Sequence, residues 1–582
     1  MERVTSCRVE LELFDTTAIS DSNFTVSNIQ KFSNINSIKN KSQEIVRIAT
    51  CENDYFLLDG SYQLYDDVND LSSKIGYMSS EFKTVIKSAF GSNHSSAGIT
   101  FHFYETMPNY IKIYFGNDES YVARKEFYPK FEDFTVLKRE DYTEYTYFAS
   151  IGAEDYNYME VELSSPDRYI RLNCIDYGVS LIYGDEYKKK VKSCSLTEET
   201  DILSTELAVN ECKVELVDSD YLFDITNPKS YYKYLQKRQK FKIIERINDE
   251  ERLMAFHYLK EWTQTKSMLA SFTLQDIVGL MSDTTFYGGM YSNISAKELI
   301  DIVMSDYGFN DYQIDENIQN IYLSGYLKVM SHREALQQIA FACGACIDTS
   351  RITGIRIFKP TLDNIGMIDT DRKLISKAHE VKQNDLVTGV SINTHSYALK
   401  EEITEVYKGN HEVGKYKVIF NNPCANLSIT GGTILSSNCN SADIDVTAAG
   451  TVIIKGNTYE DNGVAHIYKV SELPSATDEN IVSIEQATLV TTSNVDELTE
   501  YVYKLEQYRI KHELKIITVN EQVAQMLALR TNGLYVPILI TKMTTDLTGG
   551  YISSIEGIGY ALRIDDYYRT GTELYTGSEA LI

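Results

Sequence analysis

Long hydrophobic runs are absent from this sequence. No stretch of its 582 residues approaches the roughly 18 apolar residues of a membrane helix, and residues 1–8 contain no apolar segment of the kind found in secretory signals. Proline (8) and glycine (31) are not enriched, which excludes collagen-like and disordered chains. The nine cysteines are widely scattered, as is typical of proteins made in a reducing compartment. We therefore expect a soluble protein that is made in the cytosol.

Positive charge is also scarce. The sequence has 56 Lys and Arg against 83 Asp and Glu, a formal net charge of −27. A chain this acidic should repel nucleic-acid phosphates and anionic membranes. Its length suits about four domains of roughly 150 residues each.

The aromatic residues are strongly biased, with 43 Tyr and a single Trp, Trp262. Tyrosine suits half-buried strands and interfaces, where one end of the ring is dry and the other is wet. Alternation with period two predicts strands at 9–13, 100–104, 110–115, 213–217, 354–358 and 415–420. The turn spacing predicts one β-sandwich of about eight short strands over 22–185. It also predicts a small β module within 403–479.

Helices are few but well marked. Capping boxes at Ser295 and Ser331 predict two helix starts, each with a glutamate three residues later. The first helix should bury Leu299, Ile302 and Val303. Asn494 should start a third helix. Pro228 is expected to open a shorter helix that runs to Leu235.

Motifs that carry catalysis are missing. The sequence has no His-Glu-x-x-His, no Gly-x-Ser-x-Gly and no phosphate-binding glycine loop. Its one Cys-x-x-Cys, at Cys343 and Cys346, lacks the further ligands that zinc needs and is predicted to pack in the core. His94 and His102 flank a strand, where a structural role and a ligand role both stay open. The prediction is a structural or binding protein, not an enzyme, with no catalytic residue, cofactor or metal site.

One basic cluster stands out in this acidic chain: Lys233, Lys237, Arg238, Lys240 and Lys242. Two interpretations stay open. The cluster is either a solvated helix end with favourable C-terminal charges, or a docking face for an acidic neighbour such as another copy of the chain.

Several segments carry a resemblance to a known family. They are 203–210, 223–228, 234–240, 285–291, 331–342 (SHREALQQIAFA) with 348–351, and 546–551 (DLTGGY). Together they resemble the tail-tip or baseplate hub proteins of long-tailed phages and prophages of Gram-positive bacteria. The resemblance covers most of 1–20 and 186–565, and its segments are structural rather than catalytic.

The resemblance implies a mainly β fold with α+β parts. Two tail-tube-like β-barrel domains are expected over 1–21 with 186–290 and over 361–402 with 480–582. They flank an α/β connector over 291–360 and accept the β-sandwich 22–185 and the module 403–479 as insertions. Three chains would form a ring that continues the tail tube and lets DNA pass without binding it.

The resemblance also implies a location and partners. The chain would lie in the virion, at the tail tip, after assembly in the cytoplasm of the bacterial host. Its neighbours would be the tail-tube or distal tail protein, the tape measure protein, and baseplate and receptor-binding proteins.

The insertion 22–185 resembles a discoidin-type or carbohydrate-binding jelly roll through segments 53–60 and 94–101. Contact with neighbouring proteins is the preferred role, and binding of a host-surface glycan is the alternative. Two rival functions for the whole chain are a receptor-binding tail adhesin and a cell-wall-degrading tail enzyme.

Overall fold

The structure is a computed structural model. It describes residues 4–560 except 31–32, 34, 40–44, 46–75, 118–119, 139–141, 167–168, 185–189, 228–229, 249, 267, 361–365, 369–371, 374–378, 470–477 and 532–533, and also 567–570 and 573–576. Among these residues, no helix has both the length and the apolar character needed to cross a membrane.

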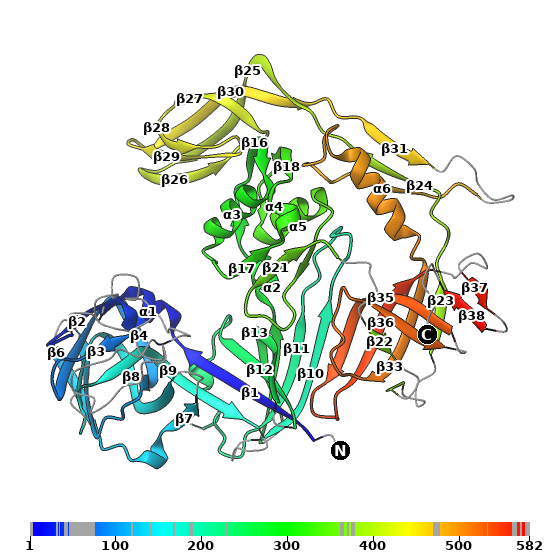
Figure 1. Cartoon of the computed structure of the whole chain (residues 1–582). Helices are drawn as coiled ribbons and strands as arrows, with labels where there is room; N and C mark the ends of the chain where they lie inside the picture. Colours follow the sequence, from blue (N-terminus) through cyan, green and yellow to red (C-terminus); the bar gives the residue numbers. More distant parts are fainter. Residues whose placement is uncertain are drawn as a thin grey trace.

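The N-terminal sandwich forms the blue and cyan body at one side of the molecule (Figure 1). Its elements are α1 (Thr16–Asp21), β2 (Ser22–Val26), η1 (Ile35–Lys39), β3 (Tyr77–Met78), β4 (Lys83–Tyr104), β5 (Tyr110–Asn117), β6 (Ser120–Phe127), η3 (Phe131–Asp133), β7 (Thr135–Lys138), β8 (Thr143–Ser164) and β9 (Arg171–Tyr183). Strands β4 and β8 pair along nearly their whole lengths and shift register between Ala89 and Gly98. One half of β4 also pairs with β2 and the other half with β9. The two halves therefore contribute to two sheets, and an aromatic core that includes Phe101, Phe103 and Tyr177 lies between them.

The sheet that we call the first hub sheet, after the resemblance described above, is built from segments that precede and follow the sandwich in the sequence. Its elements are β1 (Thr5–Phe14), β10 (Val191–Glu199), β11 (Glu211–Val217), η4 (Tyr232–Tyr234), β12 (Lys240–Ile247), β13 (Glu250–Lys266), β14 (Leu269–Gln275) and the short helix α2 (Ile277–Met281). The strands follow the order β9–β1–β12–β13–β14–β11–β10. Their alternating apolar residues enclose a core around Phe223, Phe241 and Phe272.

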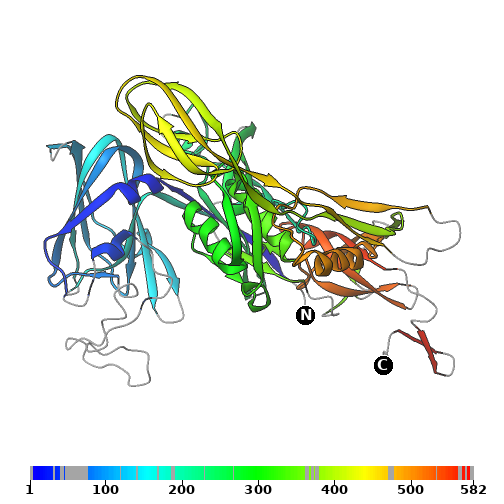
Figure 2. The same cartoon turned by 90° about the horizontal axis from the view of Figure 1, so that it is seen from above.

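The second hub sheet lies on the opposite side of the molecule from the sandwich (Figure 1, Figure 2). Its strands are β22 (Met367–Ile368), β23 (Glu380–Gln383), β33 (Ile510–Ile517), β34 (Met526–Thr531), β35 (Leu534–Asp546) and β36 (Ile552–Gly559). Strand β35 pairs with β36, β34 and also with β10 of the first sheet. The two hub sheets are therefore one continuous hydrogen-bonded ladder.

The ladder differs from the first of the two barrels that the resemblance implies. No register among the described strands joins β1 to β10, the pair that would close the first barrel. The barrel stays open because the edges of β1 and β10 that would have to pair with each other are partly paired with other strands. The second edge of β1 pairs with β9 over 9–14, and the second edge of β10 pairs with β35 over 195–199. Part of the second edge of each strand is therefore hydrogen-bonded to a strand outside the barrel.

The connector is the green α/β part in the middle of Figure 1. Its elements are β15 (Thr285–Phe286), β16 (Gly289–Ser295), α3 (Ala296–Tyr307), β17 (Tyr312–Ile314), α4 (Glu316–Gln319), β18 (Tyr322–Leu327), β19 (Met330–Ser331), α5 (His332–Ala342), β20 (Cys346–Asp348) and β21 (Ile355–Phe358). Both predicted capping boxes are confirmed at Ser295 and Ser331. The predicted inner face of the first helix is wrong at Ile302, which is 41% exposed, because Ile300 and Met304 face the core instead.

A small β module rises above the connector in Figure 1. Its strands are β25 (Tyr397–His411), β26 (Gly414–Ile419), β27 (Cys424–Thr430), β28 (Thr433–Ser437), β29 (Ser441–Val446) and β30 (Gly450–Asp461). Below it, β24 (Gly389–Asn393) pairs with β31 (Ala465–Lys469) and β32 (Ile481–Ile484), next to α6 (Val495–Glu506). The helix α6 begins after Asn494, as predicted. A hairpin of β37 (Tyr567–Thr570) and β38 (Glu573–Thr576) ends the described chain.

Candidate functional site

The predicted basic cluster lies on a loop and on the outer face of β12. Lys237, Arg238 and Lys240 are exposed, Lys242 is half-buried, and the Lys233 side chain lies outside the described residues. The helix-end interpretation is wrong here, because the described part of this segment contains only the three-residue η4 before the strand. Pro228, the predicted start of that helix, lies outside the described residues. A docking role for the cluster stays a prediction.

Two of the segments that carry the family resemblance, 203–210 and 331–342, meet at one junction. Gln337 of α5 donates hydrogen bonds from Nε2 to the carbonyls of Ser204 and Thr205, at 2.5 and 3.1 Å. Arg333 of the same helix donates to the carbonyl of Leu207. The Ser204 hydroxyl in turn donates to the carbonyl of Ala345, at 2.7 Å. Side chains from both the loop 203–210 and the helix α5 therefore fix this loop to the connector.

A buried ion pair joins the connector to both hub sheets. The Arg351 guanidinium contacts both carboxylate oxygens of Glu198 on β10 at 3.1 Å and donates to the carbonyl of Glu521, at 2.8 Å. The Glu198 side chain is 1% exposed and that of Arg351 is 12% exposed. The Glu521 carboxylate is itself paired with Arg372. Arg351 therefore contacts the first sheet and the loop before β34 at the same time.

A cleft lies beside this junction. It has a volume of about 560 Å³, and its lining includes Asp201, Glu206, Arg333, Glu506 and Arg509. Burial and the nearby Asp201 raise the pKa of the Glu506 carboxyl. The residues that line it include no histidine, cysteine or serine.

His94 in the sandwich is held between two carboxylates. Its Nδ1 lies 3.1 Å from Asp15 and its Nε2 lies 3.0 Å from Asp21. Asp15 also caps α1 by accepting from the Thr17 and Ala18 amides. The hydrogen bonds from His94 and then from Ser92 lower the pKa of Asp21 to about 2. The contacts fix the start and the end of α1 against β4, a structural role.

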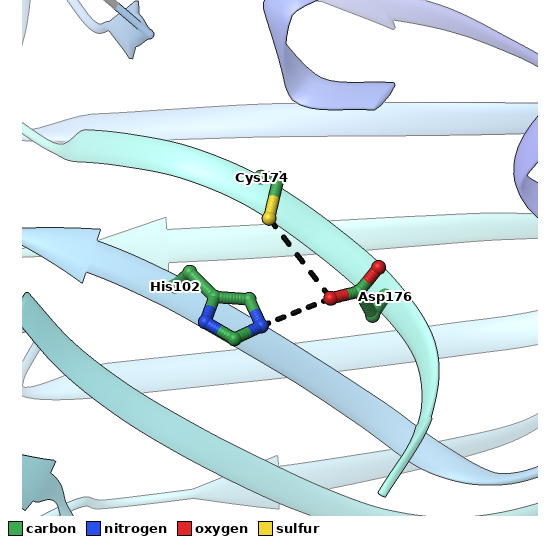
Figure 3. Close-up of side chains that lie close together, drawn as sticks. All are labelled: His102, Cys174 and Asp176. Atoms are coloured by element: carbon green, nitrogen blue, oxygen red, sulfur yellow. Dashed lines mark hydrogen bonds and ion pairs between the residues drawn. The ribbon is translucent and has the colours of Figure 1, made fainter. Parts of the chain in front are cut away.

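A second histidine on β4, His102, is also held between two carboxylates. His102 Nδ1 lies 2.9 Å from Glu144 of β8, and its Nε2 lies 2.9 Å from Asp176 of β9. Cys174 lies two residues before Asp176, and its Sγ is 4.0 Å from the same carboxylate oxygen (Figure 3). His102, Cys174 and Asp176 each direct a ligand atom into one space, where these atoms lie within 4.8 Å of one another.

Sequence reasoning identified His94 and His102 but missed their partners. Glu144, Cys174 and Asp176 come from two other strands, and their pairing depends on a register that local patterns do not reveal. The spacing of Cys174 and Asp176 is the one local signal, since residues two apart on a strand share a face. It could have indicated these two residues, but not Glu144.

The predicted packing role of the Cys-x-x-Cys is confirmed. Cys343 and Cys346 are both buried, and burial raises the pKa of the Cys343 thiol to about 12. Burial raises the pKa of Cys346 even further, and its thiol donates to the carbonyl of Ile202, at 3.1 Å. Both thiols are therefore protonated at neutral pH and serve as core groups.

No family model and no curated protein matches this chain. Among solved structures, the chain is similar to the 43 kDa tail protein of prophage MuSo2 from Shewanella oneidensis, at 10% identity and a TM-score of 0.38, covering 64% of this chain and 97% of that one. It is similar to prophage tail protein gp18 from Listeria monocytogenes EGD-e, at 10% identity and a TM-score of 0.35, covering 64% and 89%. It is also similar to the E. coli c3393 protein, at 8% identity and a TM-score of 0.32, covering 66% and 80%.

That E. coli protein is described as a type VI secretion component with structural similarity to T4 bacteriophage tail proteins gp27 and gp5. The structural neighbours are thus tail and baseplate proteins or their relatives. At these TM-scores, the fold of the present chain rests on its own strand pairing and core.

Proposed function

We propose that this chain is the structural hub of a tail tip or baseplate, in a phage or phage-tail-like particle of Gram-positive bacteria. Three copies would form a ring that continues the tail tube, and DNA would pass through it without binding. The chain would act by shape and contact rather than by catalysis, and it would reside in the virion.

One observation carries the proposal: the two hub sheets form a single ladder that is fastened at the segments resembling hub proteins. The β10–β35 pairing makes the ladder continuous. Arg351 fastens the connector to β10, and Gln337 fastens it to the loop between β10 and β11. In a ring of three chains, each chain would contribute two hub sheets, and these two sheets must keep a fixed angle to each other. A continuous backbone ladder with a buried ion pair at the joint supplies that rigidity.

The two insertions suit contacts with other tail proteins. The sandwich and the β module project from the hub in different directions (Figure 1, Figure 2). The module also exposes apolar side chains, among them Ile403, Val413 and Leu435 at 54–64%. We propose that these parts contact baseplate, receptor-binding, distal tail or tape measure proteins.

The test is a count of copies. Native mass spectrometry of the purified chain and of tail tips should give three copies, and antibody labelling should place the chain at the tail tip in electron micrographs. Six copies, or a monomer bound outside the tail, would contradict the proposal.

The basic cluster can be tested in the same experiment. Lys237→Glu with Arg238→Glu should weaken the trimer if the cluster docks on an acidic neighbouring copy, since like charges then face each other. Lys125→Glu with Lys130→Glu, a matched change on exposed lysines of the sandwich, should leave the trimer intact.

A further inference from the structure

Three ligand atoms of different chemistry converge inside the sandwich. His102 pairs with Cys174 across β4 and β9, and Asp176 lies on the same face of β9 as Cys174. His102 Nε2 is 2.9 Å from an Asp176 oxygen, and Cys174 Sγ is 4.0 Å from that oxygen. Imidazole, thiolate and carboxylate are the three side-chain types that bind zinc in proteins.

The hydrogen bonding of His102 shows what the space can hold. Both ring nitrogens face a carboxylate oxygen, Glu144 at Nδ1 and Asp176 at Nε2. A neutral imidazole has one N–H, so it can donate to only one of them. The other nitrogen then needs a cation or a second proton, because a lone pair would otherwise face an anionic oxygen.

We propose that His102 Nε2, Cys174 Sγ and an Asp176 oxygen bind one zinc ion, with Glu144 accepting a hydrogen bond from His102 Nδ1. A carboxylate on the distal nitrogen is the usual outer partner of a zinc-bound histidine, where it fixes the tautomer and the ring orientation. On binding, the thiol proton and any Nε2 proton leave to solvent. Three protein ligands leave a fourth position for water.

The distances are close to those of a bound ion. Zinc bonds of about 2.0–2.3 Å in tetrahedral geometry separate ligand atoms by roughly 3.3–3.8 Å. The observed separations of 2.9 and 4.0 Å lie on either side of that range, and all three ligand atoms lie within 4.8 Å of one another, so shifts of about 1 Å would form the site. Asp176 gives access from outside, since its side chain is 14% exposed while that of His102 is 5% exposed.

The chain contains an internal comparison. His94, eight residues earlier on β4, is also held between two carboxylates, those of Asp15 and Asp21. The described contacts of His94 include a serine hydroxyl but no thiol. The surroundings of the two histidines therefore differ in the thiol of Cys174, which lies near His102 alone. This thiol favours zinc at His102, and His94 serves as a matched control.

The experiment uses the full chain, stripped of metal with a chelator and titrated with zinc alone. Elemental analysis after gel filtration should give one zinc per chain, and cobalt(II) should produce the thiolate-to-cobalt absorption band of a tetrahedral site. Cys174→Ala should abolish that band. Glu144→Gln should weaken zinc binding by about 10–100-fold, and His94→Gln should leave it unchanged.

Two results would overturn the site. One is wild-type protein that retains no zinc and shows no thiolate band with cobalt, a measurement that needs no variant to fold. The other is zinc binding of equal affinity in wild type, Cys174→Ala and Asp176→Asn.

Discussion

At the scale of single residues, the buried Arg351–Glu198 pair is expected to have a large effect on stability. Glu198 is almost fully buried, so removing its partner leaves an uncompensated charge inside the protein. Arg351→Ala should therefore lower the free energy of unfolding by about 3–5 kcal/mol. Urea denaturation, followed by far-UV circular dichroism, measures this loss.

A neighbouring ion pair provides the control. Lys542 contacts Glu199 at 2.7 Å across the same β10–β35 pair, but both side chains are more than a third exposed. Lys542→Ala should cost about 0–1 kcal/mol, because solvent screens an exposed pair. Equal losses in the two variants would show that the junction does not depend on the buried charge.

A second residue-scale prediction concerns pH. Burial, then the adjacent His379 and Lys373, lower the pKa of His512 to about 4. In the unfolded chain the pKa of a histidine is about 6.5, so between these values the unfolded state binds more protons than the folded state. The free energy of unfolding that depends on a neutral His512 is fully present above about pH 6.5 and falls by about 3 kcal/mol as the pH drops to about 4.

Thermal melts of wild type and His512→Gln at several pH values measure this slope. The variant should lose part of the pH dependence in that window, because burial also lowers the pKa of His257 and His379, which remain. His466→Gln, on a more exposed histidine paired with Asp496, should keep the full dependence. A wild-type slope of opposite sign would contradict the prediction.

At the scale of elements, the capping box of α5 can be separated from its buried face. The Ser331 hydroxyl accepts from the Glu334 amide at 3.2 Å, and the Glu334 carboxylate accepts from the Ser331 amide at 2.8 Å. Ser331→Ala should cost about 1 kcal/mol. Leu336→Ala should cost about 2–5 kcal/mol, since Leu336 is completely buried and its loss leaves a cavity.

Thermal melts of the two variants decide this prediction, with Ser295→Ala in the capping box of α3 as a parallel case. Small and equal losses for Ser331→Ala and Leu336→Ala would show that α5 contributes little to the stability of the connector.

Local signals predicted these elements well and their partners poorly. Ser295 and Ser331 mark helix starts because capping acts within one turn of the chain. The helix α6 also begins after Asn494, but the Asn494 side chain accepts from the Thr491 amide instead of capping the helix. Ile302 was misplaced because two overlapping apolar stripes fit α3, and only the packing against α5 and the neighbouring strands selects one. The basic cluster was open to a helical interpretation for the same reason, since charge alone does not distinguish a helix end from the outer face of a strand.

The features that the sequence did not predict depend on pairing between strands that are far apart in the chain. The sequence shows that 9–13 is a strand, but not that one edge of β1 pairs with β12 and the other with β9. The His102 cluster likewise needs the registers of β4 with β8 and β9. Such registers are set by the whole sheet, so residues such as Cys174 and Glu144 carry no local mark of their role.

At the scale of the whole molecule, β9 belongs to two bodies at once. Its first half pairs with β4 in the sandwich, and its last residues pair with β1 in the hub ladder. Val179, Leu181 and Tyr183 are buried in the hub core. The sandwich is therefore attached to the hub by a continuous strand rather than by a loose linker, which favours a fixed orientation between them.

This geometry predicts how the sandwich can be removed. Phe14 pairs with Gly178, and the Asp15 amide donates to the Tyr177 carbonyl at 2.9 Å, so the two strands already lie side by side at that point. Replacing 16–176 by Asn-Gly should convert them into a two-residue hairpin, because this dipeptide favours the required type I′ turn. The shortened chain should stay soluble and keep the copy number of the full chain in native mass spectrometry. Removing 22–185 instead deletes Leu181 and Tyr183 from the hub core, which should cost several kcal/mol and give aggregated protein. If both deletions yield equally stable assemblies, the end of β9 is not needed in the hub ladder, and the rigid attachment inferred from it is wrong.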